Sequence, residues 1–151
     1  MIEVRNLTKR YGSHLAVDHL NFTVGEGKIY GFLGPNGAGK STTMNIMTGY
    51  LGATEGQVLI NGHDILKEPE EAKKNIGYLP ELPPLYMEMT VAEYLKFAAE
   101  LKKIPKNKRE AQIKEVMRLT KLKEVENRLI QNLSKGYRQR VGLAQAMLGF
   151  P

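Results

Sequence analysis

The sequence contains no cysteine and no long uninterrupted apolar run. Without cysteine the chain forms no disulfide bond and offers no thiolate to a metal ion, which is compatible with a cytosolic compartment. A stretch of about 18 apolar residues is also absent, so we expect no transmembrane helix. Met1 leads directly into the alternating residues 2–5, so we expect no secretory signal peptide. These absences argue against a disulfide-stapled secreted domain and against a membrane-spanning one.

Charge is unevenly distributed along the 151 residues, whose formal net charge is +6. Residues 1–101 hold 9 basic and 12 acidic side chains, whereas residues 102–151 hold 13 basic and 4 acidic ones. A basic half is typical of proteins that bind nucleic acid, membranes or acidic partners, and also of a solvated helical face. We favour the solvated face and expect no nucleic-acid partner. The hydrophobic content of 42% suits one folded domain with a real core.

Residues 34–41 read Gly-Pro-Asn-Gly-Ala-Gly-Lys-Ser and fit the phosphate-binding pattern G-x-x-x-x-G-K-[ST] at every fixed position. The apolar run of residues 29–33 precedes them and predicts a buried strand. Residues 42–48 follow and stop at Gly49, which predicts a helix with a glycine at its end. A strand, a glycine-rich loop and a helix in this order are the context in which the pattern binds nucleotide phosphates.

The residue types of this loop suit a phosphate bound together with magnesium. Glycines tolerate positive φ and let successive backbone N–H groups point inward at phosphate oxygens. The start of the following helix adds roughly half an elementary positive charge. We expect Lys40 to reach the β- and γ-phosphates and the hydroxyl of Ser41 to ligate Mg²⁺. The predicted nucleotide-binding residues of the loop are Gly34, Pro35, Asn36, Gly37, Ala38, Gly39, Lys40, Ser41 and Thr42.

Strand-like patterns occupy the first half of the chain and helical patterns the second. Alternation or short apolar runs predict strands over residues 2–8, 16–24, 29–33, 57–60 and 76–79. A charged helical turn is expected over residues 69–75. Residues 80–84 hold three prolines, which forbid a helix or a central strand there.

Beyond the prolines the pattern is helical. Thr90 and Glu93 have capping-box spacing at the start of a helix that is expected to run to about Lys103. Further helices are expected over residues 106–119, 122–127 and 133–147.

These elements predict an α/β fold in which a parallel sheet carries the phosphate loop, an antiparallel strand layer packs beside it, and a helical subdomain follows. The expected boundaries are 1–80 for the nucleotide-binding core, 81–140 for the helical subdomain and 141–151 for the rest of its last helix.

Three motifs stand in a fixed order: the phosphate loop, Gly-Tyr-Leu-Pro-Glu at residues 77–81, and Leu-Ser-Lys-Gly-Tyr-Arg-Gln at residues 133–139. Together they resemble the ATP-binding subunit of an ABC transporter over the whole chain. The resemblance implies a P-loop NTPase core of the ABC ATPase type that uses ATP and Mg²⁺. The glutamate after Tyr-x-Pro is similar to exporters whose membrane and ATPase subunits are separate chains.

The resemblance also implies partners and a location. A transmembrane permease subunit would dock on the helical insert, and a second ATP-binding subunit would complete a head-to-tail dimer. The protein would then be cytoplasmic and peripheral on the inner face of the cell membrane.

Two residues outside the phosphate loop receive roles from the resemblance. Tyr11 would stack on adenine, with a half-buried surface tyrosine as the alternative. Glu81 stands where the family usually has a glutamine that links Mg²⁺ to the membrane partner. A carboxylate still ligates Mg²⁺ but adds negative charge beside the γ-phosphate. Glu81 is therefore a provisional metal and catalytic residue, or a plain loop carboxylate.

The signature motif consists of Ser134, Lys135, Gly136 and Tyr137. The resemblance implies that Ser134 and Gly136 contact the γ-phosphate of ATP held by the opposite subunit. Lys135 and Tyr137 depart from the glycine and glutamine that the family usually has there. Two alternatives stay open: Ser134 as a simple helix cap, and Lys135 as a solvent-facing side chain.

The family has further catalytic segments after the signature helix. An apolar strand ends there in an aspartate that holds Mg²⁺ through water and a glutamate that polarises the attacking water, and a switch histidine follows later. None of these is present by Pro151, and the three histidines all precede the signature. We therefore expect an N-terminal portion, truncated before that strand, which by itself does not hydrolyse ATP.

Alternatives from other classes stay open. One is a P-loop ATPase of the same superfamily that works in DNA repair or translation, and another is a non-hydrolysing nucleotide-binding module. A DNA-repair ATPase inserts a long coiled coil between the phosphate loop and the signature, and no sustained heptad occurs between them here. A GTPase would carry Asn-Lys-x-Asp, which this sequence lacks.

Overall fold

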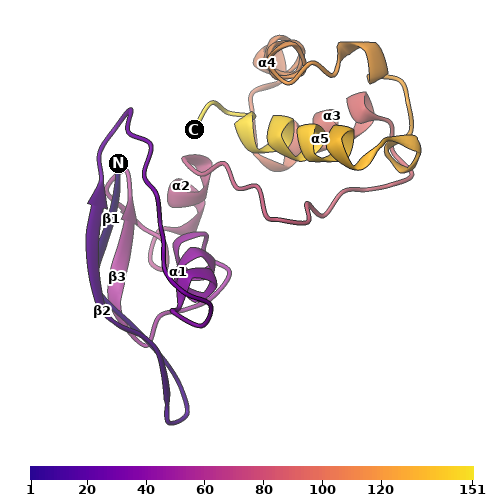
Figure 1. Cartoon of the computed structure of the whole chain (residues 1–151). Coiled ribbons are helices and arrows are strands. Elements are labelled where there is room, and N and C mark those ends of the chain that lie inside the picture. The colour runs from indigo at the N-terminus through magenta and orange to yellow at the C-terminus, as the bar shows by residue number, and fades with distance from the viewer. The chain divides into compact units, whose positions relative to one another are not determined.

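A computed structural model describes all 151 residues and divides the chain into two compact units, Met1–Ile76 and Gly77–Pro151. The first unit combines a sheet with short helices, and the second is helical (Figure 1). The sequence predicts the boundary between the nucleotide-binding core and the helical subdomain at Glu81, whereas the two units divide after Ile76. No helix combines the length and the apolar content needed to cross a bilayer.

The first unit is built on a four-stranded antiparallel sheet in the order β2-β1-β3-β4. Its strands are β1 (Ile2–Tyr11), β2 (His14–Val24), β3 (Glu55–Ile60) and β4 (His63–Asp64). Asn61 and Gly62 join β3 to β4 with φ values of 48° and 85°, as a two-residue Asn-Gly hairpin requires. The strands predicted over 2–8, 16–24 and 57–60 are therefore confirmed.

Two helices, α1 (Lys40–Met47) and α2 (Pro69–Lys74), pack apolar side chains against this sheet. Val4 and Leu7 both reach the core although they are three residues apart in β1, because a bulge with Asn6 at φ 49° lies between them. The buried cluster comprises Val4, Leu7, Val17, Ile46, Val58, Ile60, Ile65 and Ala72. This core fixes α1, and with it the loop that precedes α1, against the sheet.

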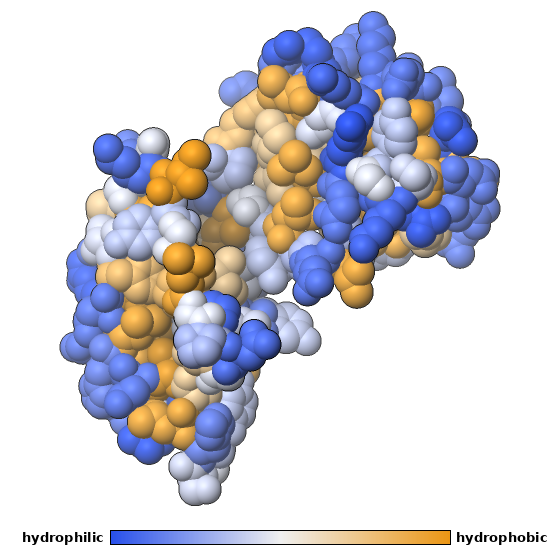
Figure 2. Space-filling model, viewed as in Figure 1, coloured by the Kyte–Doolittle hydropathy of each residue, from blue (hydrophilic) through white to orange (hydrophobic).

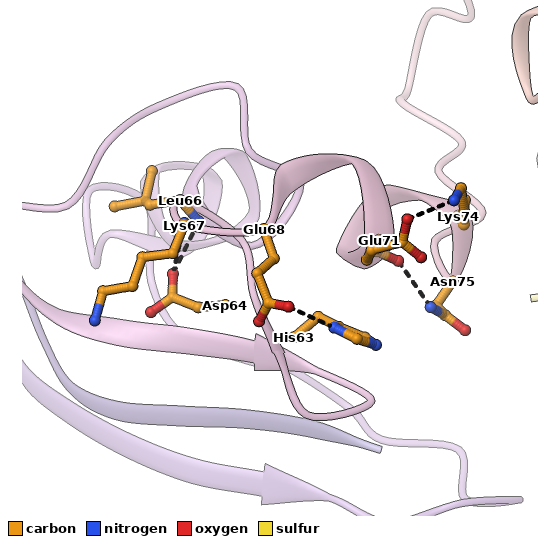
Figure 3. A network of polar contacts seen from close by, with 8 residues as sticks. All are labelled: His63, Asp64, Leu66, Lys67, Glu68, Glu71, Lys74 and Asn75. Carbon is orange, nitrogen blue, oxygen red and sulfur yellow. Dashed lines mark hydrogen bonds and ion pairs between the residues drawn. The ribbon is translucent and has the colours of Figure 1, made fainter.

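Local polar contacts hold the junction between β4 and α2 (Figure 3). The Asp64 carboxylate accepts hydrogen bonds from the backbone N–H groups of Leu66, at 2.9 Å, and Lys67, at 3.3 Å. Nδ1 of His63 lies 3.2 Å from Oε1 of Glu68. Aspartate side chains close turns in this way by bonding to backbone groups a few residues ahead. Through its contact with Glu68, His63 belongs to the same junction between β4 and α2.

Two predicted strands do not form. Residues 29–33 and 76–79 pair with no strand, and neither edge strand, β2 or β4, accepts them. Ile29 and Leu33 are 104% and 91% exposed, and Figure 2 shows hydrophobic side chains at the surface of this unit. An apolar run becomes a strand only where a neighbouring strand takes up its backbone hydrogen bonds. The α/β class is confirmed, but the predicted parallel sheet is wrong, because every strand pair is antiparallel.

The second unit consists of helices around one apolar core. Its elements are α3 (Val91–Leu101), α4 (Lys106–Leu119), the 3₁₀ turns η1 (Lys123–Val125) and η2 (Ile130–Asn132), and α5 (Lys135–Met147). The capping box is confirmed, since the Thr90 hydroxyl accepts from the Glu93 N–H and the Glu93 carboxylate accepts from the Thr90 N–H. The predicted short helix at 122–127 is a single 3₁₀ turn instead.

Side chains from all three long helices fill this core. Leu95, Val116 and Val141, one from each helix, are fully buried. Burying a side chain of this size stabilises a fold by about 1.5–3 kcal/mol. The inner face of α5 is thereby held, while its N-terminal end stays at the surface.

Lys102, directly after α3, closes the opposite end of α5. Its Nζ donates to the carbonyl oxygens of Ala146, at 3.2 Å, and Leu148, at 2.8 Å. The last carbonyls of a helix lack helical partners and form the negative end of its dipole, so a cation there is favourable. Burial lowers the pKa of the Lys102 ammonium to about 8.

Raising the pH above 8 should stabilise the fold through Lys102. Its folded-state pKa of about 8 lies below the ordinary value of 10.5, so between these values the unfolded chain binds more protons and stability rises with pH. Thermal unfolding followed by circular dichroism between pH 7.5 and about 9.5, below the range of tyrosine titration, measures this. Lys102→Met should flatten the rise, and an unchanged pH dependence in that variant would contradict the assignment.

Candidate nucleotide-binding site

The phosphate loop, residues 34–41, leads directly into α1 in the first unit. Gly37 and Gly39 adopt φ values of 84° and 86°, which residues with side chains rarely adopt. Gly39 also lies in close contact with β2, because a Cβ there would stand 2.3 Å from the carbonyl oxygen of Ala16. The loop is therefore anchored against the sheet where it enters the helix.

The N-terminal end of α1 carries backbone donors without acceptors. The first helical hydrogen bond is from the N–H of Thr43 to the carbonyl oxygen of Gly39, at 2.9 Å. The preceding N–H groups that bond to no protein atom are those of Gly39, Lys40, Ser41 and Thr42. Thr90 and Ser134 cap α3 and α5, whereas the N-cap of α1 is a glycine that has no side-chain acceptor. Such a row of donors at a positive helix end fits phosphate oxygens.

Lys40 extends back over the loop. Its Nζ donates to the carbonyl oxygens of Gly34, at 2.5 Å, and Pro35, at 2.7 Å. An ammonium group has three donors on a rotatable stem, so it can exchange these carbonyls for phosphate oxygens. Ser41, the next residue, is exposed and its hydroxyl makes no hydrogen bond within the protein.

Tyr11 lies at the end of β1, where it pairs with His14 across the hairpin turn. Its side chain is 49% exposed, and Nζ of Lys9 lies 5.3 Å from the centre of its ring. The β2 residue that contacts the phosphate loop, Ala16, lies only two positions beyond His14. The first unit thus places an exposed aromatic ring on the same hairpin that anchors the loop.

The signature motif forms the start of α5 in the second unit. The Ser134 hydroxyl oxygen accepts from the N–H of Tyr137 at 3.4 Å, which leaves its own hydrogen free to donate. Lys135 is exposed. The Tyr137 hydroxyl donates to the Glu124 carboxylate, a hydrogen bond that raises the pKa of Tyr137, and the Arg140 guanidinium lies 5.1 Å from the ring centre.

Packing does not explain the glycine at position 136. A Cβ there would meet only the Ser134 hydroxyl oxygen, at 4.0 Å, and its φ is not positive. Glycine within a helix costs about 0.5–1 kcal/mol relative to alanine. By contrast, a Cβ at Gly142 of the same helix would stand 2.8 Å from Leu79 and Pro83. Gly136 therefore leaves open space at the surface beside a free hydroxyl, where a ligand can approach.

Glu81 lies in the second unit with an exposed side chain. Its carboxylate makes no hydrogen bond within the protein, whereas its backbone carbonyl accepts from Nε2 of Gln139 at 2.7 Å. The sequence assigned no role to Gln139, although it ends the stretch Leu-Ser-Lys-Gly-Tyr-Arg-Gln at residues 133–139. The structure thus connects Glu81 to the signature helix within one unit, while Tyr11 and the phosphate loop belong to the other.

Comparison with known proteins identifies the family. The sequence profile of ABC transporters matches residues 17–151. The chain belongs to the ABC transporter family. It is 40% identical over all 151 residues to the bacitracin transport ATP-binding protein BcrA of Bacillus licheniformis and spans 48% of that relative. It is 36% identical to YbhF of Escherichia coli strain K12, a probable multidrug ABC transporter ATP-binding protein, and spans 26% of it.

Solved structures agree with the fold of this family. The ATP-binding subunit of an ABC transporter superposes with a TM-score of 0.90 at 31% identity, over 99% of this chain and 62% of the other. The bacterial ABC transporter cassette MJ0796, solved as a dimer, gives a TM-score of 0.84 at 27% identity, over 100% and 71%. The predicted ABC ATPase type of fold is confirmed. Because the chain spans about half the length of BcrA, the activity and partners of the whole protein are inferred below.

Proposed function

We propose that this chain binds Mg-ATP as part of the ATP-binding subunit of an ABC-type exporter. The uncapped N-terminal end of α1, with its free N–H groups and with the Lys40 ammonium turned back onto the loop carbonyls, carries this proposal. The row of donors suits the three linked phosphates of ATP better than the single phosphate of AMP. ATP should therefore bind more tightly than AMP. Calorimetric titration with both nucleotides in the presence of Mg²⁺ tests this, and equal affinities would contradict it.

Each residue of the site has a specific task in this proposal. The N–H groups of residues 39–42 hold phosphate oxygens, and Lys40 neutralises charge on the β- and γ-phosphates. The Ser41 hydroxyl is the side chain of the loop that would hold Mg²⁺, which screens the negative charge of the phosphates when it is bound. No group of three or more histidine, aspartate or glutamate side chains offers a separate metal site. Tyr11 supplies one face for the adenine ring.

We further infer that the signature acts on ATP held by a second subunit in a head-to-tail dimer. Support comes from the free Ser134 hydrogen and from the space that Gly136 leaves open. The surrounding positive charge of Lys135, Arg138 and Arg140 favours an anionic ligand. MJ0796, which is similar to this chain, forms a dimer.

The proposed permease contact lies on the helical unit. An apolar groove of 430 Å³ runs beside α3, with Tyr86 packed against Tyr94 and edge-on to Phe97. Leu101 lines the same groove and is 67% exposed. Exposed aromatic and aliphatic side chains of this kind suit a protein partner. Contact with a permease would place the subunit at the cytoplasmic face of the cell membrane, and the transport substrate would be set by that permease.

Glu81→Gln should leave Mg-ATP affinity within about tenfold of the unchanged protein, which corresponds to about 1.4 kcal/mol. The phosphate loop supplies most of the contacts, and the Glu81 carboxylate is exposed and unbonded. Calorimetry at saturating Mg²⁺ measures the change. A larger loss would instead establish Glu81 as a principal metal ligand.

A further inference from the structure

The segment of residues 77–83, which bends at residues 81–82, lies along one face of α5 in the second unit. At one end, a Cβ at Gly77 would stand 2.2 Å from the carbonyl oxygen of Ala146. A Cβ at Gly142 would stand 2.8 Å from both Leu79 and Pro83, so no side chain fits at that position. Toward the other end, Gln139 donates its side-chain hydrogen bond to the Glu81 carbonyl.

The three contact positions on α5 follow one helical stripe. Residues 139, 142 and 146 are spaced i, i+3 and i+7, and therefore face the same side of the helix. As the segment advances from residue 77 to 81, its contacts move back along α5 from 146 to 139. Over residues 77–81 the two backbones thus run in opposite directions in close contact, with one glycine in each partner making the approach possible. After the bend at residues 81–82, Pro83 contacts Gly142 again.

Gln139 makes the polar contact of this pairing at the end of α5 that is nearer Ser134. It lies five residues after Ser134, or about 7.5 Å along the helix axis. Glu81 receives this bond on its carbonyl, while its carboxylate stays exposed and unbonded. One side-chain hydrogen bond therefore joins α5, whose start carries Ser134, to the backbone of Glu81.

We propose that Gln139 is a positioning residue that ties Glu81 to the signature helix, so that phosphate contact at Ser134 and the placement of the Glu81 carboxylate are linked. This inference rests on the proposed function, since it assumes that both residues act on Mg-ATP. The tight glycine contacts make residues 77–83 and α5 move together. Gln139 sets where Glu81 stands within that pair.

Gln139→Glu removes the amide donor and places a negative charge against the Glu81 carbonyl. Gln145→Glu is the matched control, because Gln145 lies on the same helix, is also half-buried and makes no side-chain hydrogen bond. The backbone ¹⁵N order parameters of Glu81 and Leu82 should fall below about 0.6 in the first variant and stay unchanged in the second. Amide hydrogen exchange in α3 and α4 should stay unchanged in both. If Gln139→Glu unfolds the unit, the uncharged Gln139→Met replaces it.

Kinetics of the full-length protein distinguish a positioning role of Gln139 from a purely structural one. Gln139→Glu should lower kcat for ATP hydrolysis at least about fivefold and raise the Mg²⁺ concentration at half-maximal rate, while KM for ATP changes less than about twofold. Equal kcat in the Gln139 and Gln145 variants, or equal order parameters at Glu81 and Leu82, would overturn the inference. No Mg²⁺-dependent ATP hydrolysis by the unchanged protein would instead overturn the proposed function.

Discussion

Replacing Lys40 by alanine should weaken Mg-ATP binding by about 10- to 100-fold. Hydrogen bonds that involve a charged partner contribute about 1.5–3 kcal/mol each, and the Lys40 ammonium, folded back onto the phosphate loop, is within the loop that would make them. The carbonyl oxygens of Gly34 and Pro35, which hold its ammonium in this structure, are exposed and return to water without penalty. Calorimetric titration with Mg-ATP measures the loss.

Two comparisons make this result specific. Tyr11→Ala should weaken binding by about fivefold, or about 1 kcal/mol, because one exposed ring offers a single stacking face. Lys67→Ala removes the same charge from the surface of the same unit and should leave affinity unchanged. Equal or reversed losses for Lys40 and Tyr11 would contradict the assignment of both residues.

Changes at the signature should abolish ATP-dependent dimers of the full-length protein while each subunit still binds ATP. Ser134→Arg fills the space in front of α5 with a long side chain and removes the free hydroxyl. It also removes a helix cap worth about 1 kcal/mol, so a second variant is needed. Light scattering with and without Mg-ATP measures assembly, and calorimetry measures binding.

Gly136→Ala supplies that second variant. The added methyl group meets nothing closer than 4.0 Å, and replacing a helical glycine by alanine should stabilise the fold by about 0.4–1 kcal/mol. Dimerisation should nevertheless weaken at least about tenfold, because the methyl occupies the space proposed for the phosphate of the other subunit. If both variants form normal dimers, the signature does not contact ATP held by the second subunit.

The features that sequence predicted correctly depend on residues close together in the chain. The helix over 106–119 and the capping box of Thr90 and Glu93 are both set within a few residues. The helix predicted directly after the phosphate loop belongs to the same group and forms as α1.

The features that sequence missed depend on distant partners. Residues 29–33 have the composition of a buried strand, but composition does not determine whether another strand pairs with them. Nothing in the sequence of α5 distinguishes Gly136 from Gly142. Only the distances in the structure show that Gly142 packs against Leu79 and Pro83, whereas Gly136 faces open space. The bond between Gln139 and Glu81 spans 58 residues, so no local pattern predicts it.

The close packing of residues 77–83 on α5 constrains how this sequence can diverge. Gly142 is pressed against side chains, so a larger residue there becomes tolerable when Leu79 or Pro83 shrinks, and these positions should vary jointly among homologues. Gly77 is pressed against the carbonyl oxygen of residue 146, which is present whatever amino acid stands there. Compensation is therefore unavailable at Gly77, and evolutionary drift should leave it invariant while its neighbours exchange.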